Sequence, residues 1–128
     1  MEVIHVISVD PVSPGDESAT VTLDSGKGQL VAFCWPCGLH VGDEVENRLS
    51  TLEGTARAAY FSDWPADEIE ALSSEWMERT GHYSYKGRGR VVDEAEGLVE
   101  VNGFVIELSN VLCDGYVDFK IKRLDVRV

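Results

Sequence analysis

The sequence predicts a small, mainly β domain (β-rich α+β) with one helix between two β halves. Three observations carry this prediction: apolar side chains alternate with period two along much of the chain, an Asn102-Gly103 turn separates two such segments, and only residues 65–79 repeat their apolar side chains at helical spacing. Period-two alternation is typical of half-buried strands, and Asn-Gly is the preferred two-residue hairpin turn. The length of 128 residues predicts a single domain, residues 1–128.

The first half of the chain predicts an antiparallel meander. Residues 3–9, 19–24 and 30–35 are rich in β-branched or apolar side chains, and Pro, Gly, Ser and Asp gather in the segments between them. The next turn, Leu39 to Val45, contains Gly42, which can take the positive φ that a tight turn needs. It leads into a further strand, and the alternation over residues 56–60 favours another.

The helix is predicted over residues 65–79. Pro65 falls in the first turn, where its missing N–H is harmless, and acidic side chains lie near the positive end of the helix dipole. Ile69, Leu72 and Trp76 form the expected buried stripe. Arg79 closes the last turn, and Gly81 supplies the C-cap.

The second half predicts a hairpin over residues 99–108. With the Asn102-Gly103 turn, Val101 faces Phe104 and Val99 faces Ile106, so the turn and the apolar pattern agree on the register. Residues 117–122 continue as a strand, and residues 124–128 follow out of phase by one residue. This slip predicts a bulge near Lys122-Arg123.

The stretch from Ala19 to Leu49, with its short strands and its Gly42-Asp43-Glu44-Val45 turn, resembles an OB-fold or a related small β-barrel. The resemblance implies an antiparallel, partly closed barrel. It also implies a face that binds oligonucleotides or sugars, although a fold by itself does not assign a function.

The charge balance is strongly acidic and bounds the partners. Eleven Lys and Arg oppose 23 Asp and Glu, which gives a formal net charge of −12. Such a field repels phosphate backbones and attracts basic proteins, so nucleic-acid binding is disfavoured and a basic protein partner is favoured. The N-terminal residues lack a signal-peptide pattern, and the longest apolar run, Leu30 to Trp35, is far shorter than a membrane span. We expect a cytoplasmic protein without a membrane segment.

An acidic helix face is the preferred binding surface. The sequence therefore favours a non-catalytic protein-binding module, with an inhibitor or immunity-type role against a basic protein as an analogy. A solvated exterior is the competing interpretation of the same charges. The partner-binding candidates are Trp64, Asp67, Glu68, Glu70, Glu75 and Glu78.

A cationic segment carries the first alternative, an oligonucleotide- or sugar-binding barrel. Its ligand-face candidates are Tyr83, Tyr85, Lys86, Arg88 and Arg90. In a strand the three cations share one face, and pairing with the last strand would add Lys120 and Lys122. The competing interpretation pairs these cations with acids on neighbouring strands, such as Asp118 and Glu100.

The second alternative is a zinc-binding domain. Cys34, Cys37 and His40 are closely spaced, and Cys113 would complete a tetrahedral Cys₃His set if the fold brought it near. The competing interpretation makes Cys34 and Cys113 small apolar core residues. Apart from this zinc, no cofactor is expected. No nucleophile motif such as Gly-x-Ser-x-Gly occurs, so the sequence names no catalytic residue and leans away from an enzyme.

Overall fold

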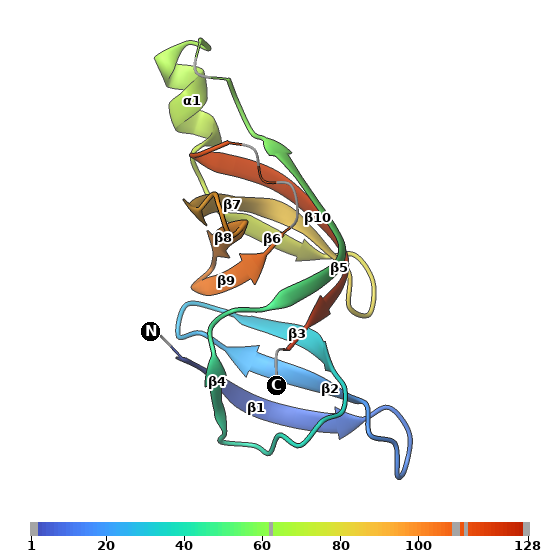
Figure 1. Ribbon diagram of the computed structural model, residues 1–128. Coiled ribbons are helices and arrows are strands. Elements are labelled where there is room, and N and C mark those ends of the chain that lie inside the picture. The colour runs from blue at the N-terminus through green and yellow to red at the C-terminus, as the bar shows by residue number, and fades with distance from the viewer. Residues whose placement is uncertain (1–2, 62, 109–110, 112, 127–128) are drawn as a thin grey trace.

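A computed structural model describes residues 3–61, 63–108, 111 and 113–126. Within these residues the chain forms ten strands and one helix (Figure 1): β1 Val3–Pro11, β2 Ala19–Asp24, β3 Gln29–Cys34, β4 Glu44–Glu46, β5 Ser50–Ala58, α1 Ala66–Leu72, β6 Trp76–Arg79, β7 Tyr85–Asp93, β8 Leu98–Val101, β9 Phe104–Glu107 and β10 Tyr116–Asp125. The prediction of a mainly β fold with one helix between two β halves is confirmed.

All ten strands belong to one sheet, and every pairing except that of β3 with β10 is antiparallel. The strand order is β4-β1-β2-β3-β10-β7-β8-β9, with β5 paired to β10 and β6 paired to β7. The sheet is not closed into a barrel. The segment between β4 and β5 contacts β9 at one isolated bridge, where the backbone of Leu49 bonds to Val105 and Glu107.

Strand β10 joins the two halves of the molecule. Along one edge it pairs first with β7 and then, at Asp125, with Phe33 of β3; along the other edge it pairs with β5. In Figure 1 the strands β1 to β4 lie in the lower half and β5 to β9 in the upper half; β10 lies with the upper strands, and its end reaches β3. One long strand therefore pairs with strands of both halves.

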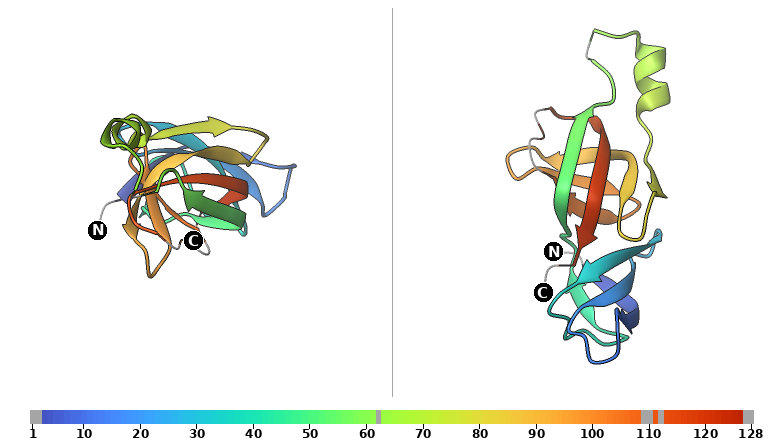
Figure 2. Two further views of the ribbon diagram at one scale, coloured as in Figure 1. Left: turned by 90° about the horizontal axis from the view of Figure 1, so that it is seen from above. Right: turned by 90° about the vertical axis from the view of Figure 1, so that its right-hand side faces the viewer.

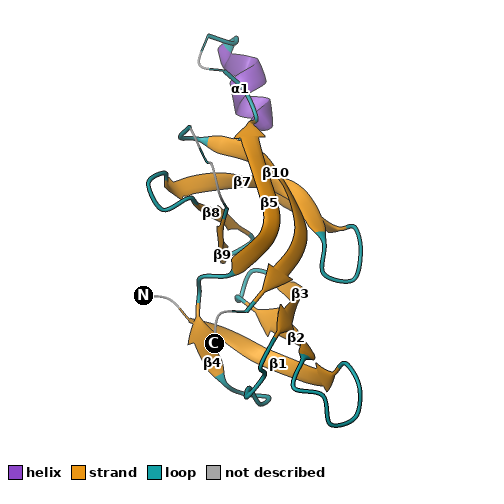
Figure 3. Cartoon of the chain, turned by 45° about the vertical axis from the view of Figure 1, so that its right-hand side comes forward, coloured by secondary structure: helices purple, strands orange, loops and turns teal. Residues whose placement is uncertain are grey.

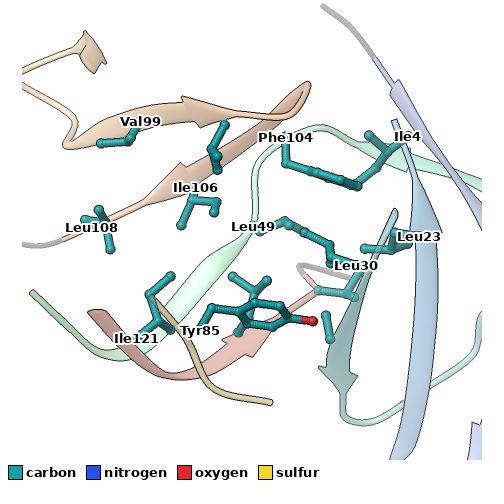
Figure 4. Close-up of a cluster of buried hydrophobic side chains, with 14 of the residues drawn as sticks. Ile4, Leu23, Leu30, Leu49, Tyr85, Val99, Phe104, Ile106, Leu108 and Ile121 are labelled. Carbon is teal, nitrogen blue, oxygen red and sulfur yellow. The ribbon is translucent and has the colours of Figure 1, made fainter. Parts of the chain in front are cut away.

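A continuous apolar core spans both halves (Figure 4). Ile4, Leu23 and Leu30 from the first half lie in one cluster with Leu49 and Phe104 from the second. The predicted hairpin contributes fully buried side chains from both of its strands, and the register is the expected one, with Val99 opposite Ile106 and Val101 opposite Phe104. Burial of this shared cluster is the main driving force for the fold.

The helix prediction for residues 65–79 is wrong in its second half. Helix α1 ends at Leu72, and Trp76–Arg79 forms β6, an edge strand on β7. The Ser73 hydroxyl donates to the carbonyl oxygen of Ile69 at 2.7 Å, a local bond that competes with continued helix. On β7, Gly87 lets the β6 backbone approach, because a Cβ there would collide with the carbonyl oxygen of Trp76. Trp76 is consequently 39% exposed and not part of a buried stripe.

At the predicted bulge near Lys122-Arg123, both β10 and β5 depart from regular strand geometry. Burial does change phase there, since Ile121 and Leu124 are both buried. The register between β10 and β5 is nevertheless the same on either side, with Ile121 opposite Gly54 and Arg123 opposite Leu52. Glu53, which faces this point from β5, has a φ of 52°. Both strands therefore distort together, and no extra residue is inserted.

Candidate functional site

The segment between β5 and β6 projects from the sheet. We call the described residues 61 and 63–74, which include α1, the arm. None of the residues of α1 is buried, and Figures 2 and 3 show the helix standing away from the strands at one end of the molecule. No side chain caps its N-terminus at Pro65. The arm is thus held by its two attachments and not by packing of the helix on the sheet.

The arm combines negative charge with exposed aromatic surface. It carries four carboxylates and no Lys or Arg; the acids are Asp63, Asp67, Glu68 and Glu70. None of these four carboxylate groups has a hydrogen bond or ion pair with another described residue. Phe61 is 63% exposed and Trp64 is 38% exposed, and their rings meet edge to face with centroids 5.8 Å apart. Such a surface is chemically suited to contact with another macromolecule.

Two of the sequence-predicted partner residues lie elsewhere and are already engaged. Glu75 accepts a hydrogen bond of 2.8 Å from the backbone N–H of Asn102, so it fastens the end of the arm to the β8–β9 turn. Glu78 belongs to β6 and pairs with Lys86 at 3.5 Å. The prediction that Glu75 and Glu78 belong to the acidic helix face is therefore wrong, because α1 ends at Leu72. Trp64, Asp67, Glu68 and Glu70 are the ones that remain together on the arm.

A second surface lies on the outer face of β6, β7, β10 and β5. The strand registers set Trp76, Arg88, Asp118 and Arg57 side by side in one row across these strands. A neighbouring row consists of Glu78, Lys86, Lys120 and Thr55. Residues that face each other across paired strands point to the same side of the sheet. A cleft of about 510 Å³ lies over these rows. We call it the cationic cleft.

The charges of the cationic cleft are only partly neutralised. Arg88 donates from Nε to the carboxylate of Asp118 at 2.7 Å, and both side chains are largely shielded from solvent. Lys86 has only the exposed contact with Glu78. Arg57 and Lys120 have no ion pair with any described residue. The predicted pairing of cations with acids on neighbouring strands is therefore present for Arg88 and Lys86 and absent, among the described residues, for Lys120.

The tyrosines of the predicted ligand face do not lie with these cations. Tyr85 is in the core, where its hydroxyl donates to the carbonyl oxygen of Val31 and accepts from the Val31 N–H, each at 2.8 Å. Burial raises the pKa of Tyr85. The Tyr83 hydroxyl lies 2.6 Å from that of Thr20. The prediction that both tyrosines join Lys86, Arg88 and Arg90 in one ligand face is wrong.

Arg90 stands apart from the cationic cleft. It faces Tyr116 on β10 and Glu100 on β8, and it pairs with Glu100 at 3.6 Å. The acid that the sequence suggested for cross-strand pairing is therefore its partner. Only Lys86 and Arg88 of the three predicted cations line the cleft.

The four predicted zinc ligands do not form a cluster. In the part of the chain that the structure describes, which includes all four, no group of three or more His, Cys, Asp or Glu side chains could hold a metal ion. Cys34 is fully buried and Cys113 packs against the core, as the apolar interpretation expects, and Cys37 packs against the core as well. Burial, followed by the neighbouring Cys37 thiol, raises the pKa of Cys34 to about 12.

The sequence reasoning missed three residues of the cationic cleft: Arg57, Trp76 and Thr55. The sequence pattern could have identified Arg57, because the alternation over residues 56–60 predicts a strand with Arg57 on the face opposite Ala56 and Ala58. Trp76 was not recognised, because the helical spacing that it shares with Ile69 and Leu72 predicted a buried helix position. The position of Arg57 opposite Asp118 depends on which strands become neighbours, and no local sequence pattern indicates that.

Within the described residues, no helix is long and apolar enough to cross a membrane. Comparison of the chain with protein-family models, with curated proteins and with solved structures gave no match.

Proposed function

We propose that the protein is a non-catalytic binding module that engages a basic protein partner through the arm. The observation that carries this proposal is the projection of α1, which has no buried residue and bears three unpaired carboxylates, next to a fourth at Asp63. An acidic surface of this kind favours encounter with a basic surface and excludes acidic ones.

The stability of the helix supports a docking role. An isolated helix of seven residues is marginal in water, because nucleation is costly and few hydrogen bonds follow it. Most helices are stabilised by packing of one face, and α1 has no such packing on the body. A partner that covers Ile69 and Leu72 would supply it. The arm would then gain order and buried apolar area in the same step.

The aromatic pair defines the partner further. Trp64 and Phe61 lie just before the helix and are exposed. Tryptophan is enriched among the residues that dominate binding energy, where it fills an apolar pocket on the other protein. The partner is therefore a protein with Lys or Arg around an apolar pocket. An inhibitor or immunity-type role against a basic protein fits this chemistry.

The test uses a defined basic probe, an amphipathic helical peptide of Leu and Lys about 18 residues long, which presents an apolar stripe flanked by cations. We expect salt-sensitive binding in a fluorescence anisotropy titration at low ionic strength. The triple variant Asp67→Lys, Glu68→Lys and Glu70→Lys is expected to weaken it by roughly tenfold or more, because close charge pairs contribute substantially to such affinities. Trp64→Ala is expected to weaken it without changing the net charge.

The matched control is the triple variant Glu17→Lys, Glu44→Lys and Glu46→Lys. These carboxylates are exposed in the β1–β4 half, so the control makes the same change in net charge away from the arm. Equal weakening by the two triple variants would show that only the overall charge matters. That result would overturn the arm as the binding surface.

A further inference from the structure

The cationic cleft is independent of the arm and supports a second kind of binding. Its volume of about 510 Å³ lies within the range of small-molecule sites. Its lining contributes four basic side chains, Arg57, Lys86, Arg88 and Lys120, against one acid, Asp118. In a chain with a net charge of −12, a local excess of cations is an exception to the overall field.

The arrangement of two lysines marks the place where an anion would bind. Lys86 and Lys120 face each other directly across β7 and β10. Like charges in this position are destabilising, because the side chains are close and no acid lies between them. On its other side Lys120 faces Thr55, which carries no charge. An anionic group between the two ammonium groups would relieve this repulsion and accept hydrogen bonds from both.

Trp76 supplies an aromatic wall beside the cations. It lies on β6 opposite Arg88 and is 39% exposed. Its row is two residues along the strands from the row of the lysines, a separation of about 7 Å. A planar ring can stack on an exposed indole while an attached anionic group reaches the neighbouring row. The hydroxyl of Thr55 adds an uncharged hydrogen-bonding group to the lysine row.

Arg88 and Asp118 fix the floor of the cationic cleft. Their bond of 2.7 Å joins β7 to β10 within the Trp76 row, and the exposed fractions of the two side chains are 15% and 28%. This pair neutralises itself and Lys86 has its exposed contact with Glu78, so the uncompensated charge comes from Lys120 and Arg57. Arg57 lies beyond Asp118, at the end of the Trp76 row. The cations therefore surround a position next to the aromatic wall.

We propose that the cationic cleft binds a free mononucleotide, with its phosphate between Lys86 and Lys120 and its base stacked on Trp76. Two observations favour one nucleotide over a nucleic-acid strand. Single-strand binding uses aromatic side chains for successive bases, whereas Trp76 is the one exposed aromatic residue among the described residues that line this cleft. The acidic surface of the remaining molecule also repels a long phosphate backbone.

The test is a titration with adenosine 5′-monophosphate at low ionic strength, monitored by tryptophan fluorescence and by calorimetry. We expect saturable quenching by this nucleotide and weaker binding of adenosine and of inorganic phosphate, since each supplies only half of the contacts. Lys120→Gln is expected to weaken binding by roughly tenfold, as a charge-assisted hydrogen bond is lost. Trp76→Ala is expected to remove the quenching, and Trp76→Phe to retain calorimetric binding.

The control is Lys27→Gln, which removes an exposed cation from the β2–β3 turn and leaves the cationic cleft unchanged. An oligothymidylate of about eight nucleotides gives the second comparison. The proposal is overturned if the nucleotide does not bind, if Lys27→Gln and Lys120→Gln weaken binding equally, or if the oligonucleotide binds more tightly than the mononucleotide. Lys120 is exposed on the sheet, so its replacement by glutamine is expected to leave the fold intact.

Discussion

At the scale of single residues, Lys86 and Lys120 place two like charges opposite each other in the cationic cleft. A binding surface often retains groups that oppose stability in the absence of ligand. We predict that Lys120→Glu raises the free energy of unfolding by about 0.2 to 1 kcal/mol, because it replaces a repulsive cross-strand pair with an attractive one. Urea unfolding at low ionic strength measures this change.

The neighbouring Lys122 provides a control of opposite sign. Lys122 pairs with Glu53 at 3.1 Å, so Lys122→Glu places two carboxylates together and is expected to lower the stability. Both variants make the same change in net charge. If the two substitutions shift the free energy of unfolding in the same direction, overall charge and not the local pair controls the effect.

A second residue-scale prediction concerns alkaline pH. Burial and Cys37 raise the pKa of the Cys34 thiol from 9.0 to about 12, so the folded state holds the proton more tightly than the unfolded state. This contribution to stability is complete below pH 9 and is lost as the pH rises from 9 towards 12. Tyr85, whose pKa is also raised by burial, acts in the same direction at higher pH.

The measurement is the free energy of unfolding in urea at a series of pH values from 7 to 11. Cys34→Ala is expected to lower stability at every pH, because a buried side chain is shortened, and also to flatten the decline above pH 9. An unchanged slope in this variant would rule out the thiol as a source of the decline.

At the scale of elements, the arm and the β8–β9 hairpin differ most in stability. The hairpin buries four fully enclosed side chains and α1 buries none. Local opening free energies follow such differences in packing. We predict that amides of residues 66–72 exchange hydrogen orders of magnitude faster than those of residues 99–106. Exchange monitored by mass spectrometry tests this, and equal protection of the two segments would contradict it.

The end of the helix shows how an element can depend on its neighbours. Residues 65–79 have helical spacing, yet Trp76–Arg79 joins the sheet because the edge of β7 offers backbone partners and Gly87 leaves room for them. Met77 then packs against the core from β6. Helical periodicity over four residues cannot compete with a row of sheet hydrogen bonds, and this gain is invisible in the local sequence.

At the scale of the whole molecule, local sequence patterns predicted the strands, whereas the composition of the candidate sites depends on pairing between strands that are distant in sequence. The strand 19–24 and the hairpin register follow from alternation and from the Asn102-Gly103 turn. The common face of Lys86 and Arg88 follows from strand parity. Tyr85 was misplaced because its hydroxyl binds Val31, which is 54 residues away in sequence. The cationic cleft likewise requires β5, β10, β7 and β6 to be neighbours.

The position of β10 has a consequence for how the chain acquires its structure. Strands β3, β5 and β7 each need β10 as a neighbour, and β10 is the last strand in sequence order. During synthesis the edges of these earlier strands that pair with β10 stay unpaired until residues 116–125 have emerged from the ribosome. Pairing between strands that are distant in sequence predicts slow folding. The unpaired strand edges are the places where one nascent chain would be most prone to associate with another chain.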